Sequence, residues 1–491
     1  MTGSDDSTGA ERSVLDAPDA GQKVIRGAAV RSLGFAGGRI LTLLSAPFLL
    51  RHLGVVGFGG FAAVQSMIGV AALASEGGLT AVGVREYSVR DDRGRASLMR
   101  AILTLRLGLS LLGALAAVAL ALAAGYSTAL VAGAALAGVG LVLQLLQQGL
   151  TVPLAAQLRF GAIAALDFIR QALTASGVVI LVALGASVTA FLAISIPVGI
   201  IVGMVTLIAL RGHLVLSAGT GRSELSAVAR DAFAVVGATI LGSLFYRLSV
   251  VLTSLLSTEA ETGYFAASQR VIEMLLPFIS LVNSATFPVL SRAAHTSFDR
   301  LAYGLQQVFD VNLVIGGWTG LVLLLGAEPI IRFLGGSEFD GAIPALQLLA
   351  VGIAASFVSA GWGTALIAMR EQRALFLATA FGAAVGVALL AVLTPNEGAQ
   401  GAALAVAIGE VVRALATGLA LVRVRPELRP RLTLVPKLVV ALGLAGLVAL
   451  TGINAVVVCV LASGIYFGLL AVTGGLPPEV WGAFRALGRG R

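Results

Sequence analysis

The stretch GYFAASQRVI at residues 263–272 matches the stretch GGFAAVQSMI at residues 59–68, with identical residues at six of the ten positions. Each stretch opens a long apolar segment, and the two lie 204 residues apart. An arginine inside the preceding apolar segment accompanies each copy, Arg39 before the first and Arg247 before the second. The chain therefore contains an internal repeat, and this repeat organises the rest of the sequence.

The composition is that of a membrane protein. Of its 491 residues, 58% are hydrophobic and 12% are charged, about half the charged share of a soluble domain. Apolar runs of about 20 residues, the length that crosses a bilayer as a helix, follow one another along the chain. Alternating strands of about ten residues, typical of transmembrane barrels, are absent from the sequence. We therefore expect an all-α polytopic membrane protein.

The apolar runs predict about fourteen transmembrane helices. Six helices separate the repeat copies, and because six is even, both copies cross the membrane in one direction. This predicts two six-helix lobes in a parallel repeat, a plan found in transporters, followed by two C-terminal helices. The predicted helices are 25–50, 57–82, 98–124, 127–150, 165–186, 188–210, 231–256, 262–290, 303–325, 342–368, 374–394, 399–422, 435–452 and 454–473.

The predicted domains follow from these helices. Residues 1–22 are polar and predict a disordered cytoplasmic tail. The remaining divisions are an N-terminal lobe (23–212), a C-terminal lobe (213–425), a helical hairpin (426–475) and a basic cytoplasmic tail (476–491).

The basic residues predict the orientation. Most of the 33 Lys and Arg, with Arg159 and Arg170 among them, lie in every second gap between spans, and the opposite loops hold Arg51 and Arg332. This asymmetry places both termini in the cytoplasm. Because the positive charge is dispersed among short loops, no nucleic acid partner is expected. The dominance of Arg over Lys, together with the excess of Ala, Gly and Val, suggests a GC-rich bacterial genome, and we expect the protein in a bacterial cytoplasmic membrane.

Arginines within the predicted spans are the candidate binding residues. A charge inside a membrane is costly unless it is paired or hydrated, so such residues are functional candidates. We expect Arg39, Arg247 and Arg270 to form a cationic patch in a cleft between the lobes. A guanidinium binds phosphate through parallel hydrogen bonds, so this patch would suit a diphosphate.

Ion pairing inside the protein is the alternative explanation for some of these arginines. Arg270 has Glu273 three residues later, on the same helix face, and Arg413 has Glu410 three residues earlier. Arg31 and Arg106 lie near the predicted cytoplasmic ends of their helices, where long side chains can reach the interface. Arg31 is also a candidate for the cytoplasmic mouth of the cleft.

Other polar residues within the spans have two interpretations each. Asp310 is a candidate site for a coupling H⁺ or Na⁺, or a partner for an arginine on a neighbouring helix. Glu273 is a candidate gate or coupling residue. Gln65 and Gln269, at equivalent repeat positions, are expected either to line the cavity or to join helices by hydrogen bonds.

Signatures of enzymes are missing from the sequence. The single cysteine, Cys459, excludes a disulfide within the chain or a cysteine zinc site, and the three histidines have no metal-binding spacing. We therefore predict no catalytic residues, no metal site and no cofactor.

Several segments resemble a known family, the bacterial polysaccharide exporters of the multidrug/oligosaccharidyl-lipid/polysaccharide superfamily, which share a MATE-like fold. They span about residues 24–425. The segments are RILTLLSAPFLLRHLGVVGFGGFAAVQS (39–66), ASEGGLTAVGVREYSV (74–89), ETGYFAASQRVIEMLLPFISLVNSATFPVLSRAA (261–294), FLGGSEFDGAIPALQLLA (333–350) and EGAQGAALAVAIGEVVRA (397–414).

The resemblance implies a Wzx-type flippase that moves undecaprenyl-diphosphate-linked oligosaccharides to the outer leaflet by alternating access. It implies diphosphate binding by arginines of helices 1 and 8, which correspond here to Arg39 and Arg270. Helix 2 has no mid-span arginine, unlike some relatives. Polysaccharide polymerases and glycosyltransferases are the expected protein partners.

Three other functions stay open from the sequence. A cation-coupled multidrug antiporter has the same fold, but helices 1 and 7 carry arginines where a cationic drug would need carboxylates. A flippase for the peptidoglycan precursor or for teichoic acid units is a closer alternative. A membrane glycosyltransferase would need a larger extracytoplasmic loop with a catalytic carboxylate.

Overall fold

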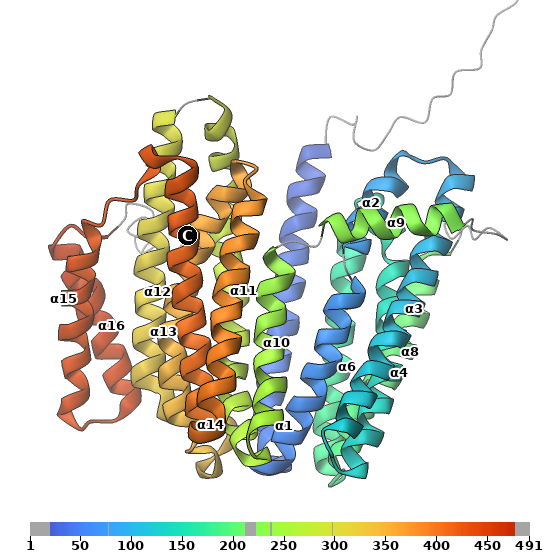
Figure 1. The fold of residues 1–491 in the computed structure, drawn as a ribbon, viewed down its shortest axis with the longest axis horizontal. Coiled ribbons are helices and arrows are strands. Elements are labelled where there is room, and N and C mark those ends of the chain that lie inside the picture. The colour runs from blue at the N-terminus through green and yellow to red at the C-terminus, as the bar shows by residue number, and fades with distance from the viewer. Residues whose placement is uncertain (1–19, 77, 212–221, 236–237, 297, 477–491) are drawn as a thin grey trace, which may run out of the picture.

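The fold is helical across the residues that the structure describes. This computed structural model describes residues 20–76, 78–211, 222–235, 238–296 and 298–476, and no strand occurs among them. Figure 1 shows long helices that run roughly side by side, in two groups. This agrees with the expected all-α membrane architecture.

The helices follow the predicted apolar segments closely. They are α1 (Ala20–Glu76), α2 (Leu79–Val89), α3 (Asp92–Ala123), α4 (Thr128–Leu150), α5 (Val152–Ala156), α6 (Phe160–Ala183), α7 (Val188–Ala193), α8 (Ser195–Ala209), α9 (Arg222–Val235), α10 (Ala238–Leu256), α11 (Glu259–Thr296), α12 (Phe298–Gly335), α13 (Ala342–Ala368), α14 (Gln372–Val424), α15 (Leu434–Gly446) and α16 (Ala455–Val472).

Two of these helices, α1 and α14, each contain a break. Gly54 has φ 63° and Gly398 has φ 55°, a left-handed conformation that glycine adopts without steric cost. Each break corresponds to a boundary between two predicted spans. Ten helical stretches of the described chain are long and apolar enough to cross a membrane, and α10 adds the shorter stretch Ile240–Leu256. The count of fourteen spans stays a prediction.

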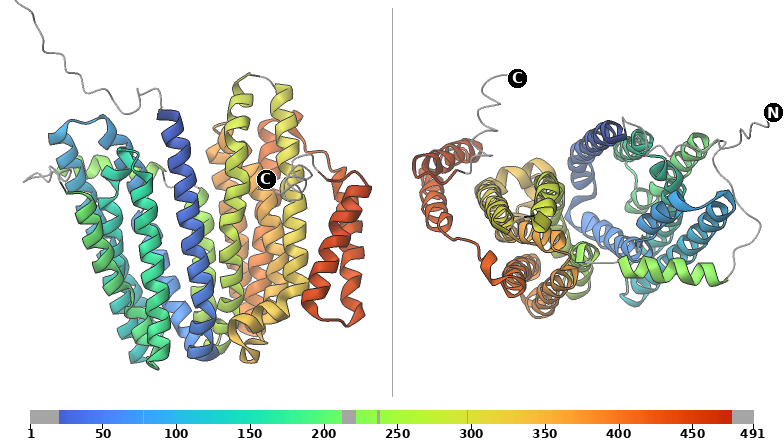
Figure 2. Two further views of the ribbon diagram at one scale, coloured as in Figure 1. Left: turned by 180° about the vertical axis from the view of Figure 1, so that it is seen from behind. Right: turned by 90° about the horizontal axis from the view of Figure 1, so that it is seen from above.

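The helices form two bundles, with a smaller hairpin at one side. Figures 1 and 2 show α3, α4, α6 and α8 in one group, α11 to α14 in the other, and α1 and α10 between them. The hairpin of α15 and α16 packs on the outer side of α12. There the Tyr466 hydroxyl donates a hydrogen bond to the Val314 carbonyl (2.8 Å), and Trp318 Nε1 donates one to Ser463 (3.0 Å).

The two repeat copies touch each other at one end of the bundles, the lower end in Figure 1, which we call the Gly54 end. A Cβ added at Gly59 would lie 2.0 Å from the Glu259 carbonyl oxygen, and one added at Gly263 would lie 2.1 Å from the Val55 carbonyl oxygen. These contacts are reciprocal, because 204 residues separate both Val55 from Glu259 and Gly59 from Gly263. Only glycine allows backbones to approach this closely.

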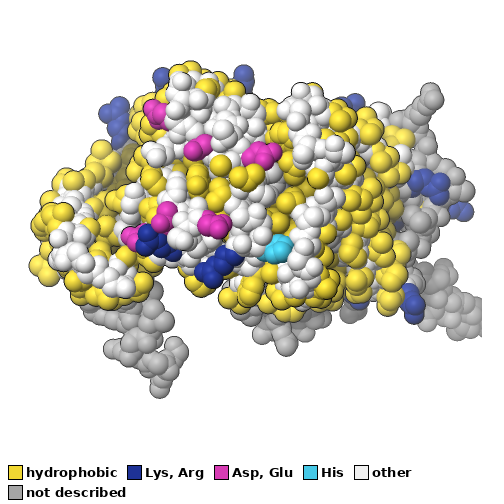
Figure 3. Space-filling view, turned by 90° about the horizontal axis from the view of Figure 1, so that it is seen from below, with side chains coloured by type: hydrophobic (Ala, Val, Ile, Leu, Met, Phe, Trp, Pro, Cys, Tyr) yellow, Lys and Arg dark blue, Asp and Glu magenta, His cyan; other side chains and the backbone are white. Residues whose placement is uncertain are grey.

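Further contacts join the lobes at the Gly54 end. Arg51 donates to the carbonyl of Phe333 (2.9 Å) in the last turn of α12, and the Tyr126 hydroxyl donates to Ser254 on α10 (2.6 Å). Figure 3 views this end and shows a few acidic and basic side chains within a mostly apolar and neutral surface. Side-chain and backbone contacts together therefore hold the lobes closed here.

The opposite end, which we call the Arg90 end, carries the short helix α9 that connects the lobes. Figure 1 shows α9 lying across the bundle axis beside α2 and α3. Glu224 forms an ion pair with Arg90, and Asp231 forms one with Arg85 at 3.0 Å. The sequence predicted one helix from residue 231, whereas the structure ends α9 at Val235 and begins α10 at Ala238.

Candidate functional site

Three charged side chains from α10 and α11 meet at the boundary between the lobes. Nη1 of Arg247 lies 3.3 Å from Oε1 of Glu273, and Nη1 of Arg270 lies 3.5 Å from Oε2 of the same carboxylate. Each oxygen of Glu273 therefore serves one arginine. We call Arg247, Arg270 and Glu273 the arginine–glutamate cluster; its formal charge is positive.

The short connection between α10 and α11 explains why these residues meet. The helices run antiparallel around residues 257–258, with Arg247 ten residues before the turn and Arg270 twelve residues after it. At 1.5 Å per helical residue both arginines lie about 15–18 Å from the turn, near the middle of a bilayer core. Arg270 and Glu273 share a helix face because they are three positions apart.

The cluster is accessible. The side chains of Arg247 and Arg270 are 36% and 35% exposed, and that of Glu273 is 18% exposed. The arginines therefore present more of their surface outward than the carboxylate that joins them. Both guanidinium groups are therefore only partly covered by the protein.

A glycine of the N-terminal lobe lies directly against the cluster. A Cβ added at Gly69, in the second segment of α1, would lie 2.9 Å from Cδ and 3.0 Å from Nε of Arg247. The stem of Arg247 thus fills the space that a larger residue at position 69 would need. Any movement of one lobe against the other would change the surroundings of Arg247.

The structure brings together some of the residues predicted to form the site. Arg247, Arg270 and Glu273 meet, and the predicted pairing of Arg270 with Glu273 is confirmed. The contact between Arg247 and Glu273 was not predicted, because the sequence gives Arg247 no acidic neighbour on its own helix. Arg31 and Arg39 belong to α1, but their side chains lie outside the described part of the structure.

The other predicted residues lie in different surroundings. Asp310 accepts a hydrogen bond from Gln306 on its own helix (2.9 Å), and its role in H⁺ or Na⁺ coupling stays a prediction. Gln65 is exposed, whereas its repeat equivalent Gln269 is 1% exposed. Neither side-chain polar atom of Gln269 has a partner among the described residues, so the two equivalent glutamines are not used in the same way.

A buried ion pair lies elsewhere in the C-terminal lobe. Nε of Arg413 lies 3.1 Å from Glu410, as predicted from their spacing, and Ser356 also donates a hydrogen bond to Glu410. Tyr246 lies 3.4 Å from the Ser356 hydroxyl. Because Glu410 is 2% exposed and neutralised by Arg413, this group is part of the packing between α10, α13 and α14.

The position of Arg106 differs from the predicted one. Arg106 was expected to extend to the interface, but its side chain is fully buried and donates to the Leu145 carbonyl (3.0 Å) and to Thr80 (2.6 Å). The carbonyl lies on α4, five residues before the last residue of that helix. Arg106 therefore joins α2, α3 and α4.

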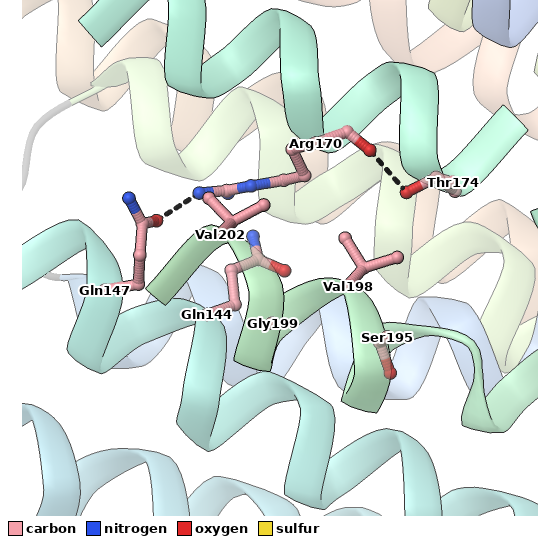
Figure 4. Close-up of a pocket in the computed structure, with 8 residues that line it drawn as sticks. All are labelled: Gln144, Gln147, Arg170, Thr174, Ser195, Val198, Gly199 and Val202. Carbon is pink, nitrogen blue, oxygen red and sulfur yellow. Dashed lines mark hydrogen bonds between the residues drawn. The ribbon is translucent and has the colours of Figure 1, made fainter. Parts of the chain in front are cut away.

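The position of Arg170 also differs from the predicted one. Arg170 was counted among loop arginines, but it lies ten residues into α6 and borders a small polar cavity between α4, α6 and α8. Figure 4 shows its guanidinium extended toward Gln147, which accepts a hydrogen bond from it. Gln147 in turn donates to Thr206 on α8 (2.8 Å). The cavity is lined by Gln144, Gln147, Arg170, Thr174, Ser195, Val198, Gly199 and Val202.

The size of this cavity decides what it can hold. Its volume of about 60 Å³ accommodates a few water molecules. A diphosphate or a sugar is too large for it. These polar residues therefore line a small, water-sized cavity in the N-terminal lobe, and the arginine–glutamate cluster is the better candidate for substrate binding. Among the described residues, no group of three or more His, Cys, Asp or Glu could hold a metal ion.

Comparisons with known proteins agree with this architecture. Residues 48–344 match the model of a family described as "Polysaccharide biosynthesis protein". No curated protein sequence matches the chain.

Solved structures show the same fold. A lipid II flippase, MurJ, in an inward closed conformation superposes with a TM-score of 0.71 at 15% identity, covering 91% of this chain and 98% of its own. An inward-facing multidrug resistance MATE transporter gives 0.57 at 16% identity, covering 81% and 94%. An outward-facing multidrug resistance MATE family transporter superposes with a TM-score of 0.55 at 16% identity, covering 84% of this chain and 97% of its own.

Proposed function

This chain belongs to the polysaccharide biosynthesis protein family, and we propose that it flips an undecaprenyl-diphosphate-linked oligosaccharide across the bacterial cytoplasmic membrane. The substrate would move from the cytoplasmic to the outer leaflet by alternating access. Such an oligosaccharide is a precursor of a cell-surface polysaccharide.

One observation carries the proposal: two arginines at mid-helix depth hold a single carboxylate between them, at 3.3 and 3.5 Å. Two guanidinium groups placed around one anion are suited to a diphosphate, whose oxygens can accept hydrogen bonds from both. Arg39, on the helix before the first repeat copy, is the third proposed contact. Charges at this depth are costly and are typical of substrate pathways.

The position of the cluster at the lobe boundary supports alternating access. The Gly59 and Gly263 contacts close the Gly54 end, and Gly69 of one lobe lies against Arg247 of the other. Separation of the two glycine contacts would open the Gly54 end and move Gly69 away from the cluster. The substrate would then meet the same two arginines from either side.

The charge distribution supports the assignment of sides. Arg85, Arg90, Arg93 and Arg95 lie at the Arg90 end. At the Gly54 end Arg332 pairs with Glu328 and Asp340, and Arg51 donates to the Phe333 carbonyl. Positive charge marks the cytoplasmic side of membrane proteins. We therefore assign the Arg90 end and both termini to the cytoplasm and the Gly54 end to the outside.

A cation-coupled multidrug antiporter is less well supported by the same site. A cationic drug needs a carboxylate that is not already neutralised. Within the described chain, Glu273 is shared by two arginines and Glu410 is paired with Arg413. The peptidoglycan precursor and teichoic acid units stay alternatives, because their carrier lipids present phosphate groups of the same kind.

Complementation in a bacterium that lacks this protein tests the proposal. We expect Arg247→Gln and Arg270→Gln to abolish export of the surface polysaccharide at normal expression, since each removes one phosphate contact. Arg423→Gln, at an exposed arginine near the end of α14, is the matched control and should retain export. Full export by both cluster variants would refute the diphosphate site.

A further inference from the structure

The carboxylate of Glu273 contacts both arginines that we propose to bind the diphosphate. It lies between Arg247 and Arg270 with one oxygen toward each. Both contacts are longer than the 2.7–2.9 Å typical of close charge-assisted hydrogen bonds. Each arginine also uses one nitrogen for this contact, not the two of a bidentate pair. The bridge is therefore loose, and it leaves donor groups on both arginines for another anion.

Exposure shows which partner can be replaced. Glu273 is about half as exposed as either arginine, so an anion that approaches the cluster meets the guanidinium groups first. The part of the chain that the structure describes offers the two arginines no other carboxylate in ion-pair contact. Glu273 is therefore the resident counter-ion of the empty site.

We propose that Glu273 competes with the substrate's diphosphate for Arg247 and Arg270, and thereby sets how strongly the site holds its substrate. This inference rests on the proposed function. The glutamate keeps the two arginines in position when the site is empty, and it returns to them when the substrate leaves. A transporter needs this balance, because a substrate bound by two unopposed arginines would be released slowly.

The competition also gives the site a preference. An anion must make up for the contacts that Glu273 loses, and a diphosphate can contact both arginines at once. A monophosphate has fewer oxygens and less charge with which to replace the bridging carboxylate. We therefore expect Glu273 to weaken the binding of a monophosphate more than that of a diphosphate, so that Glu273→Gln narrows the difference in affinity between the two.

Binding measurements on the full-length protein in nanodiscs test the inference, with farnesyl diphosphate and farnesyl monophosphate as probes. Removal of one like charge from a partly exposed site changes affinity on the order of tenfold. We expect Glu273→Gln to bind farnesyl diphosphate about tenfold more tightly than the original protein does. Glu397→Gln, at an exposed glutamate of the same lobe, is the matched control and should bind as the original protein does.

The outcomes separate this inference from the proposed function. If Arg247→Gln and Arg270→Gln weaken diphosphate binding but Glu273→Gln leaves it unchanged or weakens it, the competition is refuted and the site stands. If neither arginine variant weakens binding, the proposed site itself is wrong. Should Glu273→Gln fold poorly, Glu273→Asp is the second variant. Its carboxylate lies one methylene farther from the guanidinium groups, which lengthens contacts already at 3.3 and 3.5 Å, so tighter binding is again expected, and unchanged or weaker binding refutes the competition.

Discussion

Arg247 on α10 lies 3.3 Å from Glu273 on α11, and this contact converts a pair within one helix into a three-residue cluster. The pair of Arg270 and Glu273 alone would be neutral. Addition of Arg247 from the neighbouring helix leaves one positive charge in excess, at the boundary with the other lobe. The positive excess is what makes the cluster a candidate for an anionic substrate.

Because Gly59 touches the other repeat copy, we predict that a larger side chain at position 59 separates the two lobes. Leucine in place of Gly59 would put Cβ within 2.0 Å of the Glu259 carbonyl oxygen, which belongs to the backbone and cannot rotate away. We expect Gly59→Leu to hold the lobes apart at the Gly54 end and to abolish transport. Distances between spin labels at Val55 and Glu259 measure the separation directly.

Gly203 on α8 provides the control for this substitution, because nothing lies within 4 Å of a Cβ added there. Gly203→Leu should leave both the label distance and transport unchanged. An unaltered distance distribution in Gly59→Leu would show that the glycine contact does not hold the lobes together.

The buried Arg106 predicts a loss of stability without a loss of binding. Arg106→Ala leaves the Thr80 hydroxyl and the Leu145 carbonyl without their donor, at a cost of about 3 kcal/mol in the free energy of unfolding. Thermal unfolding in detergent should show a lower midpoint, while the folded variant binds farnesyl diphosphate normally. If the folded variant instead binds farnesyl diphosphate much more weakly, Arg106 contributes to substrate binding as well as to stability.

Sequence and structure agree where a property depends on neighbours along the chain. The apolar runs predicted most helices to within a few residues, and the spacing of three predicted both the Arg270–Glu273 and the Arg413–Glu410 pairs. The breaks at Gly54 and Gly398 fall where spans were expected to end.

The differences arise where contacts join separate helices. The sequence does not indicate that Glu273 also reaches Arg247, since 26 positions separate them. Arg106 was placed by its distance from a helix end and Arg170 by the charge pattern of the loops, but their environments depend on which neighbouring helices offer polar partners. The repeat itself was visible in the sequence, whereas the backbone contact of its two glycines needed the packing of α1 against α11.

The Arg413–Glu410 pair predicts non-additive effects. Glu410→Gln leaves Arg413 in a mostly buried position without its counter-charge and should destabilise the protein by about 2–3 kcal/mol. The double variant Glu410→Gln with Arg413→Met removes both charges. It should unfold at a higher temperature than the sum of the single effects implies, as measured in a double-mutant cycle. Additive effects would mean that the two side chains do not depend on each other.

The contact between Arg332 and Asp340, in the turn that follows α12, predicts that this turn is less stable in acid. A hydrogen bond from Arg332 is the main cause that holds the pKa of Asp340 below its ordinary value. A carboxylate whose pKa is lower in the folded protein stabilises the fold above its ordinary pKa of about 3.9, and it loses this effect as the pH falls through the folded value.

Hydrogen exchange of residues 336–341 measures this effect. Protection should be retained at pH 6 and reduced at pH 3. Asp340→Asn should show reduced protection at both pH values. Equal protection of the original protein at the two pH values would contradict the role of this contact.

Most of the proposals above depend on Arg247 and Arg270 binding the diphosphate of the lipid while the protein moves it across the membrane. The most direct test of this role is the flipping of a fluorescent polyprenyl-diphosphate-linked disaccharide in proteoliposomes that contain the purified protein. We predict that the original protein and the Arg423→Gln variant transfer the lipid between leaflets. The double variant Arg247→Gln, Arg270→Gln should transfer it no faster than protein-free vesicles do. Transfer at the original rate by that double variant would contradict this role of the two arginines.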